Sequence, residues 1–278
     1  MASLQRQGGS ATTIGLKFCC ERLFRLLPAL IVAVLICFEV MIAVGYEPTT
    51  EQLIKNLILY DNPINGATWT LNAEAIGTFF ILAGYFAYRR LGLSGLLLVL
   101  VLVVTAGRHL PPKDLFYFFR WSALPFAIGM LIPTRAGRDL LLAIPVWLIW
   151  IAALVAVFGR HITDAHGSTT ENVSIACAGL VVAALFYNKA GELGRILATR
   201  PLVFLGTISY SLYLFNVVFV IVATKLIGTR PTLFGAISEG LIIIALTIPI
   251  ALASYHWIER PMINLGRRLL GWRSSGSQ

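Results

Sequence analysis

Three ionisable side chains stand inside long apolar stretches of this sequence: Glu39, Glu74 and Arg120. A charge in hydrocarbon is costly, so such residues usually pair with one another or serve a function. All three are expected in the outward third of a membrane, where Glu74 and Arg120 could pair across two helices or line a cavity. The alternative is a purely structural pair, or side chains that reach toward the aqueous surface.

Ser209, Tyr213 and Asn216 form a second group of candidate residues. Their i, i+4 and i+7 spacing places three hydrogen-bonding side chains on one face of a helix. We expect this face to point into a helix bundle. There it could bind a polar substrate, or it could simply hydrogen-bond a neighbouring helix.

The His and Cys residues show no spacing typical of a metal site or a disulfide framework. His161 and His166 lie in a loop and lack the i, i+4 spacing that places two His side chains on one helix face. His256 precedes Trp257 near the end of an apolar stretch, where we expect it to anchor the chain at the membrane surface. We therefore predict no bound metal and four reduced cysteines.

The composition explains what positions these side chains. Hydrophobic residues make up 58% of the chain and charged residues 13%, against roughly half and a quarter in soluble domains. Apolar runs cover Leu23–Val44, Trp69–Tyr88, Leu91–Ala106, Phe116–Ile132, Leu140–Phe158, Val173–Tyr187, Leu202–Ile227 and Leu233–Ile258. Most approach the ~20 residues that cross a bilayer as a helix. The sequence thus predicts an all-α, polytopic transmembrane bundle of about eight spanning helices, with a membrane domain at 17–270 between disordered tails at 1–16 and 271–278.

The net charge of +9 does not indicate a nucleic-acid partner. Lys and Arg are spread in twos and threes between the apolar runs and form no single basic face. Most of them fall on one side if the runs alternate across the membrane, which predicts that both termini are cytoplasmic. Because the apolar runs cover most of the chain, its predicted partner is the lipid bilayer.

Four segments resemble, in order, the motifs of the membrane acyltransferase type 3 family. They are Glu21–Pro28, Thr68–Glu74, Arg120 with Phe126–Met130, and Leu205–Phe215 with Tyr255–Pro261. The second resembles the family's Trp-Ser/Thr-Leu-x-x-Glu motif, and the third its Arg followed by Phe-x-x-Gly-Met. Each match is weak alone, but the ordered set is specific and covers nearly the whole chain.

This resemblance implies a multi-pass enzyme of a bacterial inner membrane that O-acylates, most simply O-acetylates, an envelope polysaccharide, lipopolysaccharide or lipid-linked sugar. The donor would be cytoplasmic acyl-CoA, acetyl-CoA above all, with no resident cofactor. Arg22 and Arg25 would meet the donor's phosphates, unless they serve only as topogenic charges. Glu74 and Arg120 would shape the outward cavity, and Trp69 would cap that helix at the interface.

The sequence departs from the family pattern in two places. Family members usually open with two further helices that carry an Arg and a His regarded as the catalytic base, and Asn216 stands where the family often has another His. Since Asn cannot accept the proton of a hydroxyl, Glu74 is the best remaining candidate for the base, with His109 behind it. We therefore expect either a truncated or mis-started member, or an inactive one. Two alternatives from other classes are a flippase-like carrier and a non-catalytic membrane subunit.

Overall fold

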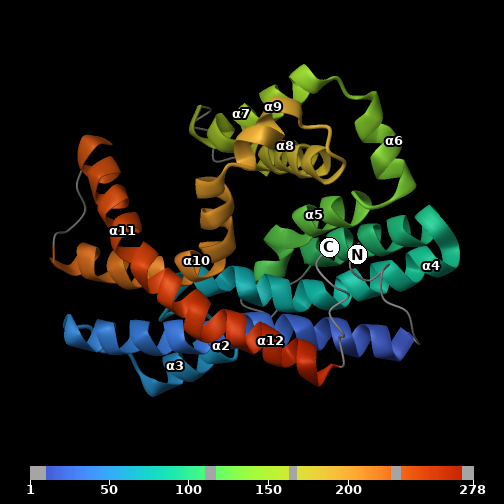
Figure 1. Ribbon diagram of the computed structural model, residues 1–278. Helices are drawn as coiled ribbons and strands as arrows, with labels where there is room; N and C mark the ends of the chain where they lie inside the picture. The colour runs from blue at the N-terminus through green and yellow to red at the C-terminus, as the bar shows by residue number, and fades with distance from the viewer. Residues whose placement is uncertain (1–10, 110–116, 163–167, 227–232, 271–278) are drawn as a thin grey trace. The chain divides into compact units, whose positions relative to one another are not determined.

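The computed structural model describes residues 11–109, 117–162, 168–226 and 233–270, and every element in these ranges is helical (Figure 1). The helices are α2 (Ala11–Ala43), α3 (Thr50–Leu57), η1 (Gly66–Thr68), α4 (Trp69–His109), α5 (Tyr117–Leu131), α6 (Arg135–Ala143), α7 (Val146–Ile162), α8 (Ser168–Phe186), α9 (Gly191–Leu197), α10 (Arg200–Leu226), α11 (Leu233–Ser254), η2 (Tyr255–Glu259) and α12 (Arg260–Leu269). The chain forms two compact units. The central unit comprises residues 73–203, and the described part of the terminal unit comprises 11–72 and 204–270.

Five helices in the described residues are long and apolar enough to cross a membrane, or six if the bent pair α6–α7 is one span. This makes the chain a multi-pass membrane protein. The predicted total of eight spans is not confirmed, and the predicted cytoplasmic termini remain a prediction. One reason for the lower count is that the described part of the fourth run, α5, has only 15 residues, fewer than the ~20 needed to cross hydrocarbon.

A second reason is that the apolar runs Trp69–Tyr88 and Leu91–Ala106 form one element, α4, with 41 residues. Gly92 breaks it with φ 64° and ψ −146°, angles that a residue with a side chain rarely adopts. Its two arms run antiparallel, because Gly84 lies against Leu96 while Ile76 shares a core cluster with Val103. The two runs are therefore separate arms of a hairpin.

In the rest of the central unit, α7 packs against α8 and α6 joins α7 at a sharp bend. Helices α7 and α8 run antiparallel, since Gly159 lies against Ser174 at one end and Ile149 clusters with Ala184 at the other. Helix α6 meets α7 at an angle of 103°. There the Lys189 ammonium donates to the carbonyl oxygens of Leu141, Leu142 and Ile144 at 2.8, 2.9 and 2.6 Å, and so replaces the hydrogen bonds that a helix C-terminus lacks.

The terminal unit has its core between α2 and α10. Ala33, Val34 and Cys37 of α2 pack with Leu214 and Phe215 of α10, and all five are fully or almost fully buried. The two helices run in the same direction. Tyr210 donates to the Leu26 carbonyl toward the middle of both helices, and Lys225, in the last turn of α10, lies 4.6 Å from the ring centroid of Tyr46, just past the end of α2.

Helices α11 and α12 complete this unit. Ser211 of α10 contacts Ser254 of α11, while Phe219 and Leu246 line one pocket nearer the middle of the pair, so α10 and α11 are antiparallel. Beyond η2, α12 returns along the first turns of α2. Gly266 lies so close to Phe24 that a Cβ atom there would be 2.9 Å from the Phe24 Cβ.

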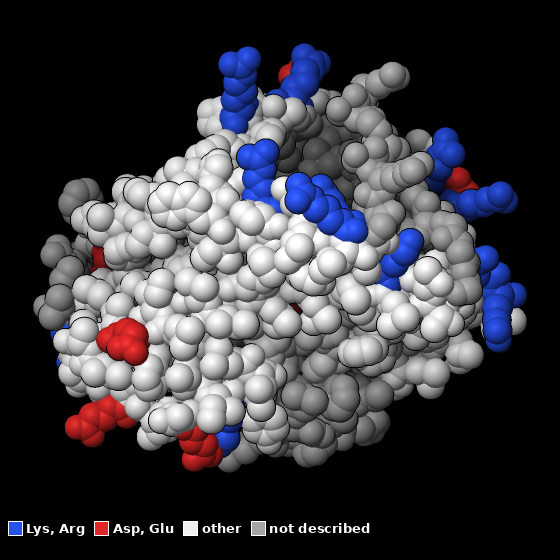
Figure 2. All heavy atoms as spheres, turned by 60° about the horizontal axis from the view of Figure 1, so that its bottom comes forward, with Lys and Arg blue, Asp and Glu red and all other residues white. Residues whose placement is uncertain are grey.

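These directions agree with runs that alternate across a membrane. The first and seventh runs are parallel, whereas the second and third, the fifth and sixth, and the seventh and eighth runs are antiparallel. Figure 2 shows that uncharged side chains make up most of the described surface on the face it draws. An uncharged surface of this kind suits contact with lipid tails.

Helix α2 begins earlier than the first apolar run predicts. It starts at Ala11, within the segment 1–16 predicted as a tail, and passes through Pro28 without ending. The remainder of that tail and the tail 271–278 lie outside the described residues.

Candidate functional site

The connection between α2 and α4 contains a buried polar network that carries the Thr-Trp motif. Asn56, Asn65 and Thr68 are at most 1% exposed. The Asn56 side chain accepts from the backbone amides of Ile64 and Asn65 at 3.1 and 2.7 Å and donates to Thr68 Oγ1 at 2.7 Å. All three bonds are shielded from water, so one asparagine fixes the turn that leads into η1.

Asn65 and Tyr213 then attach this turn to α10. The Asn65 side chain donates through Nδ2 to the Leu214 carbonyl at 3.0 Å. Its Oδ1 accepts from the backbone amide of Ala67 at 3.1 Å, which caps η1. Tyr213 Oη donates to the Ala67 carbonyl at 2.9 Å and lies 3.2 Å from Thr70 Oγ1. The predicted site residue Tyr213 therefore contacts the Trp69 motif, and Trp69, at the first position of α4, is 37% exposed.

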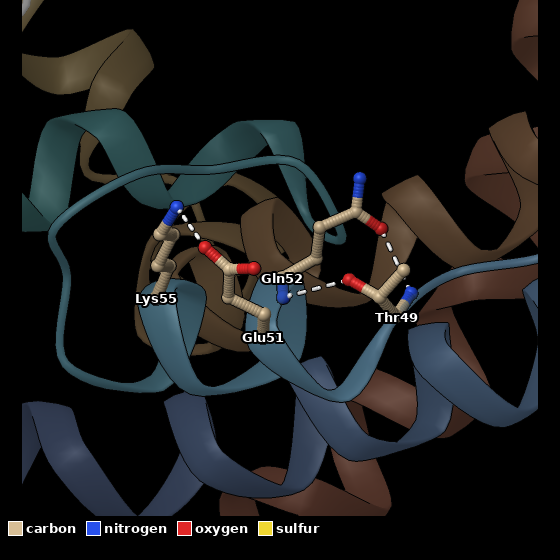
Figure 3. A network of polar contacts seen from close by, with 4 residues as sticks. All are labelled: Thr49, Glu51, Gln52 and Lys55. Carbon is tan, nitrogen blue, oxygen red and sulfur yellow. Dashed lines mark hydrogen bonds and ion pairs between the residues drawn. The ribbon is translucent and has the colours of Figure 1, made fainter.

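Helix α3 supports the same connection from outside. Its first turn has a complete capping box, in which Thr49 Oγ1 accepts from the Gln52 amide and Gln52 Oε1 accepts from the Thr49 amide (Figure 3). Glu51 and Lys55 form an ion pair of 2.5 Å one turn apart on the exposed face. The hydrogen bond and charge of Lys55 lower the pKa of the Glu51 carboxyl below its ordinary value.

Glu74, the best candidate base, belongs to the central unit and is half-buried. The first arm of α4 runs parallel to α5, because Gly77 lies against Phe126 and Gly84 against Met130. Ile76 of this arm also clusters with Ala123. In this register the helical turn with Glu74 is level with the turn that contains Arg120, whose side chain lies outside the described residues.

The remaining predicted residues are spread along α2 and α10. Ser209 is exposed and donates to the Gly206 carbonyl of its own helix, while Asn216 is half-buried. The Arg22 guanidinium lies 5.2 Å from the Phe18 ring centroid, and Arg25 is exposed. His109, His161 and His166 have no described side chains.

A second buried polar cluster lies where α10, α11 and η2 meet, and sequence reasoning missed it. Ser211 Oγ contacts both Ser254 Oγ, at 2.7 Å, and Glu259 Oε1. These three side chains are at most 4% exposed, and Arg25 is close enough to interact with the Glu259 charge. The π-helical turn η2 places Glu259 inward, and such turns are frequent at functional sites. The sequence did contain a signal for this cluster, since Glu259 belongs to the motif Tyr255–Pro261.

No group of three His, Cys, Asp or Glu side chains in the described ranges is arranged to hold a metal ion. The chemistry of both clusters is that of hydroxyl, amide and carboxyl groups. It suits hydrogen bonding and proton transfer.

Comparison with known proteins gives one finding. The model of one family, described as an acyltransferase domain, matches residues 9–256. No curated protein and no solved structure matches the chain.

Proposed function

Since this chain belongs to the acyltransferase type 3 family, we propose that it moves an acyl group, acetyl in the first instance, from cytoplasmic acyl-CoA to a hydroxyl of an envelope glycan at the outer face. The family match over residues 9–256 carries this proposal. The resemblance of the four ordered motifs supports the choice of a glycan hydroxyl as acceptor.

The reaction needs a base at the acceptor. The acceptor oxygen attacks the thioester carbonyl carbon, a C–O ester bond forms, the C–S bond breaks, and the thiolate leaves and takes up a proton. The acceptor proton passes to a carboxylate, and we assign this role to Glu74. Its position supports this assignment, because its helical turn is level with that of Arg120. A guanidinium there would stabilise the negative charge that develops on the carbonyl oxygen.

The donor would bind at the cytoplasmic face of the membrane. Arg22 and Arg25 lie in the first half of α2, and Arg25 is exposed. Guanidinium groups suit the phosphates of a coenzyme A donor because they form paired hydrogen bonds with them. The charge of the buried Glu259 is close enough to attract the Arg25 guanidinium.

The test measures transfer of radiolabelled acetyl from acetyl-CoA to glycan in membranes that contain the protein. Wild-type protein is expected to label the glycan, and Glu74→Gln is expected to lower the rate by about 100-fold or more. Glu39→Gln is the matched control, because Glu39 is also a carboxylate of an apolar helix but is exposed on α2. Equal rates in the two variants would remove Glu74 from the mechanism, and transport of an unmodified sugar without labelling would favour a carrier.

A further inference from the structure

One face of α12 carries a basic hollow that the proposed reaction does not use. It has a volume of about 490 Å³. Its lining residues in the described part of the chain are His256, Arg260, Pro261, Asn264, Leu265 and Arg268. Four of them follow one another at steps of four residues, which places their side chains along one face of a helix.

The opposite face of the same segment is packed. Glu259 is 3% exposed, and Gly266 is buried against Phe24 of α2. Arg260, Asn264 and Arg268 are exposed. The hollow therefore faces away from α2, and its two guanidinium groups are available to a ligand.

Exposed apolar side chains flank these cations. Trp257 is 80% exposed, Leu265 42% and Leu269 67%. Large apolar groups beside Arg on one helical segment are typical of the boundary between lipid headgroups and acyl chains. The free phosphate of a soluble ligand would leave these apolar groups in water.

The length of the last span places α12 at that surface. The apolar helical stretch Ile237–Leu269 has 33 residues, which amounts to about 50 Å of helix. Hydrocarbon accounts for only ~30 Å of this length. Since Arg260, Arg267 and Arg268 are all in α12, the α12 end is the one that extends to the level of the lipid headgroups.

From this geometry we propose that the hollow binds the phosphate headgroup of an anionic phospholipid. Arg260 and Arg268 donate to the phosphate oxygens, since guanidinium groups match their geometry. Asn264 supplies amide hydrogens to the rest of the headgroup, and Leu265 contacts the start of an acyl chain. The ligand class is defined by a negative charge joined to a hydrocarbon tail.

The experiment titrates short-chain phosphatidylglycerol into the purified full chain in neutral detergent and measures bound lipid by native mass spectrometry. The wild-type protein is expected to retain phosphatidylglycerol in preference to phosphatidylcholine. The double variant Arg260→Gln with Arg268→Gln is expected to bind about 25-fold more weakly, about fivefold for each guanidinium lost. Its elution profile and thermal unfolding should match those of the wild type, since both side chains are exposed.

The matched control is Arg135→Gln with Arg138→Gln, which removes two exposed Arg side chains from α6. It should bind phosphatidylglycerol as the wild type does. Equal weakening in both double variants would mean that general charge attracts the lipid, and it would overturn the proposal. Displacement of the lipid by millimolar inorganic phosphate would also overturn it, because the site would then recognise phosphate without a tail.

Discussion

Asn56→Ala tests whether the buried network between α2 and α4 holds the Trp69 motif in place. The Asn56 side chain is the acceptor for two buried backbone amides, those of Ile64 and Asn65. Each buried amide left without an acceptor costs about 1–3 kcal/mol, so the variant should lose about 2–6 kcal/mol of unfolding free energy. That loss is large against total stabilities of about 5–15 kcal/mol.

Two measurements read out this effect. Unfolding in mixed detergent micelles by added dodecyl sulfate gives the free energy of unfolding. Hydrogen exchange followed by mass spectrometry shows whether the Ile64 and Asn65 amides lose protection. The control is Asn62→Ala in the same loop, which removes one exposed hydrogen bond of 3.1 Å to the Gly66 carbonyl and should cost about 0.5–1.5 kcal/mol. Equal losses in the two variants, with unchanged exchange at Ile64 and Asn65, would refute the reasoning.

Three further predictions concern packing, a helix end and pH. Gly77→Ala should destabilise the protein by about 1–3 kcal/mol, because the added Cβ would lie 2.5 Å from the Phe126 ring. The control Gly129→Ala adds a Cβ in open space and should be neutral or stabilising in the same unfolding assay. Lys189→Met should cost about 1–3 kcal/mol and speed hydrogen exchange at the end of α6, since three carbonyl oxygens lose their donor; unchanged exchange there would contradict it. The pKa of Glu51 is lowered in the folded state, so its pair with Lys55 stabilises α3 above the ordinary carboxyl pKa and is lost as pH falls through the lowered one. The protection factors of the α3 amides, which correct for the fall of the intrinsic exchange rate with pH, should therefore drop on acidification in the wild type, and a Glu51→Gln variant that shows the same drop would disprove the role of the pair.

The helical architecture follows from the sequence because each apolar run is long and its ends are marked by charged or turn residues. The break between the second and third runs is an example. Arg89 and Arg90 separate them, and the hairpin of α4 turns beside this pair, at Gly92. The number of spans is harder to predict, because α5 is short and α6 meets α7 at a sharp bend. Apolar composition does not distinguish a bent or short helix from a spanning one.

The candidate site is only partly visible in the sequence. Trp69 and Tyr213 were predicted separately, and their connection through the Ala67 carbonyl depends on residues 146 positions apart. Asn56 and Asn65 look like ordinary turn residues, since their partners are set by the folded loop. Glu259 was missed because the last apolar run ends just before it, whereas the π-helical turn continues the helix and buries the carboxylate.

Transfer across the membrane is the central claim of this account, and sealed proteoliposomes test it most directly. Radiolabelled acetyl-CoA is placed on one side and a glycan acceptor on the other, with protein-free vesicles beside them. The account predicts labelled glycan only in the vesicles that contain the protein, with coenzyme A retained on the donor side. Unlabelled glycan in these vesicles, under conditions where a reference acyltransferase of the family labels its own acceptor, would contradict the claim.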